Sequence, residues 1–207
     1  MVYDEAITRK SFNEMLRFLR FANKIGEVPL LFGGWAVYQY NPYAGSRGVD
    51  FVVSDENFDA CVDFLVSIGY ELKELRLKKG TIFFDLYKKS ERINPEIELD
   101  LDFFYKKAER VYLKGTAHEV LLPKLPTLFL SKAHALISRD VPKDQSDVIS
   151  LLAKFRDTDF EIKRNLDEKT KSKLELLINK IDVFSLVMKP TKKNIEEVNS
   201  RLKKLLK

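Results

Sequence analysis

The sequence predicts an α+β protein in which a mixed sheet flanked by helices is followed by a helical C-terminal region. Three observations support this fold class. A short apolar stretch runs into Gly33-Gly34 and then into a helical pattern, the stretch IELDLDFFY alternates between apolar and polar residues, and apolar spacing becomes helical from Pro126 onward. We therefore expect an α/β domain over residues 1–125 and a helical domain over residues 126–207.

The N-terminal domain is expected to alternate helices and strands. Ser11 can cap a helix that runs to about Lys24, because apolar residues recur there at helical spacing and Gly26 follows. The other elements expected in this domain are a strand at 28–32, a helix starting at 35–40, a strand at 48–55, a helix at 57–68 closed by Gly69, two strands within 70–90 and a strand at 97–105.

The C-terminal domain is expected to contain four helices, at 127–139, 142–155, 169–187 and 191–207, with a linker at 156–165. Pro142 suits the first turn of the second helix, where the missing N–H of proline would be unpaired in any case. The last helix has one apolar stripe, with Lys and Arg elsewhere. This pattern favours a helix docked on the protein over an RNA-binding arm.

Composition narrows the function classes only modestly. The net charge of +5 and the pI near 9.1 permit a nucleic-acid partner without requiring one. One cysteine, Cys61, and two histidines, His118 and His134, are too few for a Cys/His zinc site. We see no secretion signal and no apolar run long enough to span a membrane, so we expect a cytoplasmic protein. The small number of glutamines is a weak indication of a thermophile.

Half of the eight glycines, Gly33, Gly34, Gly45 and Gly48, fall within residues 33–48. A glycine pair between a strand and a helix lets the backbone approach a ligand closely, and free N–H groups at the start of the helix suit phosphate. Asp50 follows in an apolar strand, where a carboxylate is costly to bury without a partner or a metal. Magnesium prefers such oxygen ligands and takes substrate phosphates as its others.

This arrangement resembles the signature of the nucleotidyltransferase (DNA polymerase beta) superfamily, a Gly-Gly or Gly-Ser turn followed by a strand that carries Asp-x-Asp. The resemblance implies a nucleotidyltransferase fold, NTP as substrate and Mg²⁺ as cofactor. It implies that Gly33 and Gly34, with Ser46 and Arg47 in the following loop, contact the triphosphate, and that Asp50 is a metal ligand and catalytic residue.

The sequence departs from that signature at the second Asp of the pair, because position 52 is Val52. Gly48 also stands where the family often has threonine. The resemblance places a third carboxylate on a later strand, and Asp100 or Asp102 of IELDLDFFY can supply it as a catalytic metal ligand. The other interpretation of these two residues is a solvated polar face on an edge strand.

The helical half resembles later motifs of AbiEii-type toxin nucleotidyltransferases and their uncharacterised relatives. That group has a lysine on one helix and KD-x-x-D on the next, which here are Lys132, Lys143, Asp144 and Asp147. The resemblance implies catalytic roles for Lys132 and Asp147. Lys132 and Arg139 share a helix face and can neutralise triphosphate charge. Asp144 and Asp147 are also well placed to stabilise the start of their helix.

The expected function is magnesium-dependent transfer of NMP from an NTP to an RNA, a protein or a small molecule. The resemblance to toxins adds tRNA or another RNA and an antitoxin protein as partners, with no membrane partner. Two alternatives stay open. The chain could be a degenerate nucleotide-binding or regulatory module that lost catalysis with the second Asp, or a nucleic-acid-binding protein that uses its basic C-terminal tail.

Overall fold

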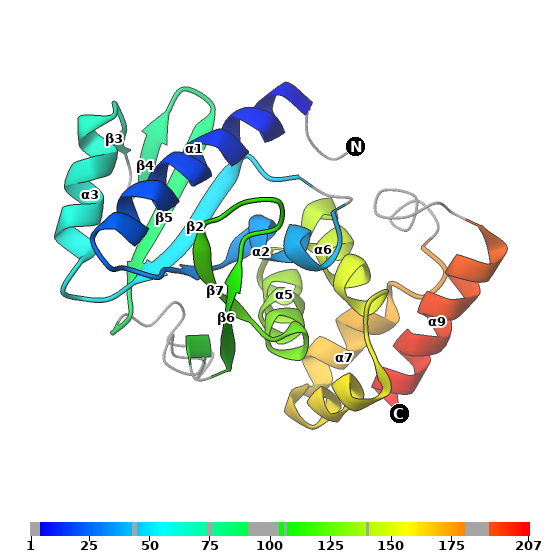
Figure 1. The fold of residues 1–207 in the computed structure, drawn as a ribbon. Coiled ribbons are helices and arrows are strands. Elements are labelled where there is room, and N and C mark those ends of the chain that lie inside the picture. The colour runs from blue at the N-terminus through cyan, green and yellow to red at the C-terminus, as the bar shows by residue number, and fades with distance from the viewer. Residues whose placement is uncertain are drawn as a thin grey trace. The chain divides into compact units, whose positions relative to one another are not determined.

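The computed structural model describes residues 5–42, 45–73, 76–90, 104–105, 107–139, 141–180 and 191–207. The chain forms two compact units. The α/β unit comprises residues 5–39 and the segment Gly45–Lys124, and the helical unit comprises Tyr40–Ala44 and Leu125–Lys207. Figure 1 shows the elements of both, and each unit is described by itself. None of the helices that the structure describes is long and apolar enough to cross a membrane.

The α/β unit contains a seven-stranded mixed sheet in the order β3-β4-β5-β2-β1-β7-β6. The pairs β1–β7 and β2–β5 are parallel, and the other neighbouring strands are antiparallel. The predicted mixed sheet flanked by helices is therefore confirmed. The strands are β1 (Leu30–Leu31), β2 (Gly48–Val53), β3 (Glu71–Lys73), β4 (Arg76–Lys79), β5 (Ile82–Lys88), β6 (Ala108–Tyr112) and β7 (Glu119–Pro123).

Helices α1 (Glu5–Lys24) and α3 (Phe58–Ser67) contact each other, and both contact the sheet. Figure 1 shows α1 lying across the central strands. Phe18 of α1 is fully buried, with its ring centroid 5.1 Å from those of Phe51 on β2 and Phe84 on β5. Because side chains alternate along a strand, this packing assigns Phe51 and Phe84 to the α1 side and their neighbours to the opposite face.

The start of α1 differs from the prediction. The helix begins at Glu5, one and a half turns or more before the predicted cap Ser11. Ser11 lies inside the helix, is fully buried, and accepts a hydrogen bond of 3.0 Å from the indole Nε1–H of Trp35 on α2 (Gly33–Tyr40). A serine before an apolar stripe can accept a hydrogen bond from a buried indole as well as from the free N–H groups of a helix end. The local spacing of residues does not show which of these two donors it binds.

Several strands also differ from the prediction. The strand at 28–32 is shorter, and β6 was not expected. The first of the two strands expected within 70–90 corresponds to two strands, β3 and β4. The predicted strand at 97–105 lies outside the described residues except for Phe104 and Tyr105, and these two residues are helical rather than extended. The hairpin around Gly80 is confirmed, because β4 and β5 pair antiparallel across it.

The helical unit contains α5 (Leu125–Arg139), α6 (Pro142–Leu152), the 3₁₀ helix η1 (Asp157–Asn165), α7 (Glu168–Glu175) and α9 (Lys192–Leu206). Pro142 opens α6 as predicted. The predicted linker at 156–165 is instead η1, stabilised at its start by the Asp159 carboxylate, which accepts a hydrogen bond of 2.6 Å from the backbone N–H of Arg156. The docked C-terminal helix is confirmed: its apolar stripe is buried, and Arg201 donates to the last carbonyl groups of α6.

Candidate functional site

Gly33 begins α2 directly after β1 and lies against Asp50 on the neighbouring strand β2. The backbone N–H of Phe32 donates to the Asp50 carbonyl at 2.9 Å, which fixes the two segments side by side. Gly33 has φ +62°, and a β-carbon there would lie 1.9 Å from the Asp50 Oδ2 atom. Both the backbone conformation and the space therefore require glycine. The Asp50 carboxylate is thus held at the first turn of a helix.

Asp50 pairs in register with Asp85 on the parallel strand β5. Both carboxylates lie on the sheet face opposite α1, because their sequence neighbours Phe51 and Phe84 point into the core. Asp50 is half-buried, and Asp85 is 8% exposed. Adjacent strands are about 4.8 Å apart, so the two acidic side chains share one small region of this face.

Asp85 forms a bidentate ion pair with Arg76 of β4. Arg76 donates from Nε to Oδ1 at 2.6 Å and from Nη2 to Oδ2. The hydrogen bond to Asp85 raises the pKa of Arg76 above its ordinary value, and the nearby charge of Asp50 adds a smaller contribution. Arg76, Asp85 and Asp50 thus form a row of alternating charge across three neighbouring strands.

Sequence reasoning missed Asp85 and Arg76. It placed the later carboxylate at Asp100 or Asp102, which both lie outside the described residues and so remain predictions. A signal for Asp85 was present, since it interrupts the apolar stretch IFFDLY in the same way that Asp50 interrupts GVDFVV. What the sequence does not contain is the register that brings the two aspartates together.

Val52, which occupies the place of the second aspartate, is part of an apolar cluster with Leu30 and Phe104. All three side chains are 2% exposed or less, and the Phe104 ring lies edge-on to Phe32 with centroids 4.8 Å apart. Tyr105 donates from its hydroxyl to the Val52 carbonyl at 3.0 Å. Position 52 therefore contributes packing and no ligand atom.

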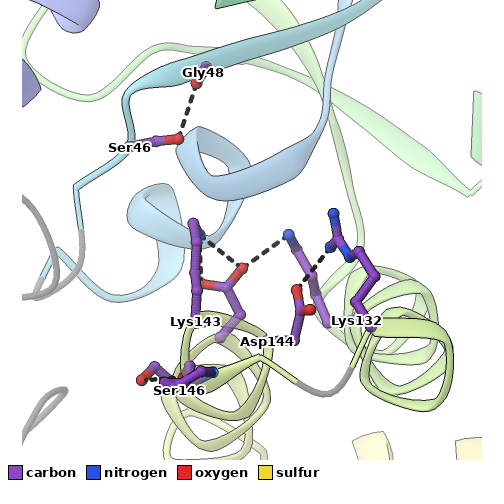
Figure 2. A network of polar contacts seen from close by, with 9 residues as sticks. Ser46, Gly48, Lys132, Lys143, Asp144 and Ser146 are labelled. Atoms are coloured by element: carbon purple, nitrogen blue, oxygen red, sulfur yellow. Dashed lines mark hydrogen bonds and ion pairs between the residues drawn. The ribbon is translucent and has the colours of Figure 1, made fainter. Parts of the chain in front are cut away.

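Ser46 and Arg47 lie in the loop that leads into β2. The Ser46 hydroxyl donates to the carbonyl of Gly48 at 2.9 Å, a contact visible in Figure 2. The side chain therefore stabilises its own loop. The Arg47 guanidinium lies over the Phe83 ring of β5, 5.4 Å from its centroid, on the same sheet face as Asp85.

In the helical unit, Lys132 of α5 and Lys143 of α6 share one buried carboxylate, that of Asp147 (Figure 2). The Lys132 and Lys143 Nζ atoms lie 2.8 and 3.0 Å from Asp147 Oδ2. Burial raises the pKa of Asp147, but the two ammonium groups outweigh burial, so the pKa is below its ordinary value. The structure therefore brings these three predicted residues together with a net charge of +1.

Arg139 and Asp144 form a separate ion pair in the same unit, with Arg139 Nη2 2.7 Å from Asp144 Oδ1. Asp144 is buried in the first turn of α6, where the helix dipole stabilises a negative charge. Its Oδ2 atom is buried and has no hydrogen-bond partner among the residues that the structure describes. Lys132 and Arg139, which were expected to act on one triphosphate, thus each bind a different aspartate.

His134 of α5 lies near this cluster in sequence but takes no part in it. Both of its ring nitrogens are buried and have no hydrogen-bond partner in the described part of the chain. Burial lowers the pKa of the imidazole. Across the residues that the structure describes, no group of three or more His, Cys, Asp or Glu side chains is arranged to hold a metal ion. The described carboxylates of the candidate site are those of Asp50 and Asp85.

Three solved structures align with most of this chain. One is the crystal structure of an antigenic nucleotidyltransferase-like protein from Paracoccidioides brasiliensis, with 15% identity, 82% of this chain and 88% of that chain covered, and a TM-score of 0.54. Another is the antibiotic-resistance factor ANT(2'')-Ia in solution, with 10% identity, 91% and 89% covered and a TM-score of 0.45. The third is a crystal structure of ANT(2'')-Ia in complex with adenylyl-2''-tobramycin, with 11% identity, 92% and 95% covered and a TM-score of 0.47.

The similarity to the Paracoccidioides protein shows that this chain has a nucleotidyltransferase-like fold, as the Gly33-Gly34 and Asp50 motif predicted. No protein-family model and no curated protein matches the sequence. The resemblance of the helical half to AbiEii-type toxins stays a prediction.

Proposed function

We propose that the chain transfers a nucleoside monophosphate from an NTP to an acceptor hydroxyl. The observation that carries this proposal is the packing of the Asp50 carboxylate against Gly33, beside a second carboxylate on the adjacent strand. In the reaction, the acceptor oxygen bonds to the α-phosphorus, the bond to the bridging oxygen breaks, pyrophosphate leaves and the hydroxyl proton passes to a carboxylate. Catalysis of this kind depends on positioning and on neutralising charge.

Gly33 and Gly34 are proposed to receive the triphosphate. The first turn of α2 presents backbone N–H groups that have no partner within the helix, and the helix dipole adds positive potential there. Glycine at position 33 lets the Asp50 carboxylate lie against the backbone, so a cation held by that carboxylate would be close to phosphate at the start of α2. The adjacent Asp50 carboxylate would repel these oxygens, which is why a cation is needed between them.

The donor set fits one magnesium ion. Mg²⁺ is commonly held by one or two carboxylates together with substrate phosphates, and Asp50 and Asp85 are two carboxylates on one sheet face. A bound Mg²⁺ would neutralise phosphate charge during transfer. Val52 adds no ligand. For Asp85 to bind the ion, it must give up at least one of its two hydrogen bonds with Arg76.

Asp85 is proposed to take the role first assigned to Asp100 and Asp102. It lies on the far side of Asp50 from Gly33, where an acceptor hydroxyl would approach an NTP held at the glycines. A carboxylate in that position can orient the hydroxyl and take its proton. In the helical unit, Lys132 and Lys143 share the carboxylate of Asp147, and the catalytic roles of Lys132 and Asp147 stay predictions from the resemblance.

The first test is calorimetric titration of ATP, GTP, CTP and UTP, each with and without Mg²⁺, on the wild type and on Asp50→Asn and Asp85→Asn. Binding that needs Mg²⁺ and weakens in both variants supports the proposal. Nucleotide binding that is independent of Mg²⁺, with no pyrophosphate released in the presence of cellular RNA or small-molecule acceptors, supports the alternative of a degenerate nucleotide-binding module. Val52 is the observation that favours this alternative.

The toxin hypothesis has its own test. If the chain is the toxin of a toxin–antitoxin pair, its expression should arrest growth, and Asp50→Asn should relieve the arrest at equal protein level. Normal growth on expression of the wild-type chain would remove the toxin hypothesis and leave nucleotidyl transfer standing.

A further inference from the structure

Three cationic side chains surround the ring of Phe83 on β5. The Arg76 guanidinium lies 4.7 Å from the ring centroid, the Lys78 ammonium 5.3 Å and the Arg47 guanidinium 5.4 Å. Arg76 and Lys78 come from β4, and Arg47 comes from the loop before β2. We call Arg47, Arg76 and Lys78 the Phe83 cation cluster. Each lies within the distance at which an aromatic ring attracts a cation.

The cluster lies one row of side chains away from the carboxylate pair. Lys78 and Gly48 are the register partners of Phe83, and two residues further along β5 the next row contains Asp85 and Asp50. Two residues of a strand span about 7 Å, so the rows are neighbours on the same sheet face. Apart from its chain neighbours Arg47 and Val49, Gly48 has no described atom within 4 Å of the place where its β-carbon would lie. The register partner of Phe83 on β2 therefore adds no side chain of its own beside the ring.

The charges of this cluster are only partly compensated. Arg76 is paired with Asp85, whereas Arg47 and Lys78 have no ion pair within the part of the chain that the structure describes. Like charges brought together on one sheet face repel each other. The ring offsets part of that repulsion, and an anion bound among the three cations would offset more. The local chemistry therefore fits a phosphate group.

The position of the cluster distinguishes the two substrates. Along the row across the strands, Gly33 lies beyond Asp50 on one side, and Asp85 and Arg76 lie on the other. The triphosphate is assigned to the glycine side, at the start of α2. Arg76 and Lys78, both on β4, are on the opposite side of the carboxylates from Gly33, which is the side left for the acceptor. Arg47 directly precedes β2, the strand that carries Asp50.

We propose that the Phe83 cation cluster binds a phosphate group carried by the acceptor. The inference rests on the proposed nucleotidyl transfer, because that function assigns the acceptor to this side. The phosphate can belong to a nucleic acid strand or to a small phosphorylated molecule. A polycationic acceptor is excluded by the same charges that attract phosphate.

The test compares Lys78→Gln with Lys88→Gln in the full chain. Lys88 is a matched control because it is also a strand lysine over a phenylalanine ring, 4.9 Å from the centroid of Phe58, but it lies on the opposite face of β5. The probes are a fluorescein-labelled single-stranded RNA, followed by polarisation at several salt concentrations, and ribose 5-phosphate, followed by calorimetry. Arg47→Gln serves as a second cluster variant. Arg76 is left intact because it also holds Asp85.

For RNA, Lys78→Gln should lower the slope of log K against log salt by about 0.7, the contribution of one phosphate contact to a single strand, while Lys88→Gln leaves the slope unchanged. A loss of affinity confined to ribose 5-phosphate would support the proposal and identify a small phosphorylated acceptor. Equal effects of Lys78→Gln and Lys88→Gln, or no binding of either probe, would overturn it.

Magnesium-dependent ATP binding is measured in the same variants. If ATP binding is retained in both Lys variants, the proposed function stands whatever the two phosphate probes show. If the wild type does not bind ATP, that result counts against the proposed function alone.

Discussion

The Asp50 carboxylate and the α-carbon of Gly33 are in such close contact that no side chain fits at position 33. An added β-carbon would lie 1.9 Å from Asp50 Oδ2 and 2.5 Å from its carboxyl carbon. The glycine also adopts φ +62°, a conformation that side chains disfavour. Glycine at position 33 thus satisfies two requirements, room for the Asp50 carboxylate and a positive φ. Only the positive φ is a property of the local chain.

Gly33→Ala should therefore cost more than an alanine at another glycine of similar conformation. Gly115 is the matched control, because it has φ +78° and no atom within 4 Å of its added β-carbon. Gly115→Ala should lower the free energy of unfolding by about 1–2 kcal/mol from backbone strain alone. Gly33→Ala should exceed that value, displace Asp50 and abolish magnesium-dependent nucleotide binding. Urea unfolding and calorimetry measure the two effects. Equal stability losses with nucleotide binding retained would show that the contact with Asp50 is unimportant.

Asp85→Asn should reduce transfer activity by about 10²–10⁴-fold if Asp85 orients and deprotonates the acceptor. The fold should survive, since Arg76 is about half exposed and an ion pair with an exposed partner contributes little stability. Asp100→Asn and Asp102→Asn are the competing variants. The rate of pyrophosphate release under saturating NTP, measured in all three variants, shows which carboxylate the reaction needs. A loss in either of these variants with full activity in Asp85→Asn would restore the original assignment.

The comparison of Asp50, which was predicted, with Asp85, which was not, shows what a sequence can and cannot predict. Gly33 and Asp50 were predicted because the strand, turn and strand that carry them are close in the chain. Asp85 was missed because its role depends on the parallel register of β2 with β5, a pairing across 35 positions that no local pattern encodes. The early start of α1 was missed for a similar reason, since Ser11 serves Trp35 on another helix.

Asp147→Asn should destabilise the protein strongly. It leaves Lys132, which is 8% exposed, without a compensating charge, and breaking a buried ion pair typically costs about 3–5 kcal/mol. Asp157→Asn is the control, because Asp157 binds Lys204 at the surface and its side chain is 95% exposed. Urea unfolding followed by circular dichroism should show a large shift of the midpoint for the first variant and almost none for the second. Similar midpoints for both would show that the buried pair adds no stability.

His134 should make stability depend on pH below neutrality. Burial lowers the pKa of its imidazole in the folded chain below the ordinary value of 6.5, so the unfolded chain binds the proton first as pH falls. The free energy of unfolding should therefore decrease as pH drops through 6.5 and level off below the folded pKa. In His134→Leu, the thermal unfolding midpoint should vary less between pH 7.5 and 5.5 than it does in the wild type. An unchanged pH profile in His134→Leu would assign the dependence to other groups.

Val52→Asp introduces the second aspartate of the nucleotidyltransferase signature, yet we expect it to impair the protein. The carboxylate would enter a cluster in which Leu30 and Phe104 are at most 2% exposed, and burying an unpaired charge there is strongly unfavourable. Val52→Thr is the control of nearly equal volume with only a hydroxyl added. Unfolding midpoints should fall in the order wild type, Val52→Thr, Val52→Asp, and transfer activity should not rise in Val52→Asp. A gain in activity would mean that the apolar cluster opens to admit a metal ligand, and that the site is built for three carboxylates rather than for the pair of Asp50 and Asp85.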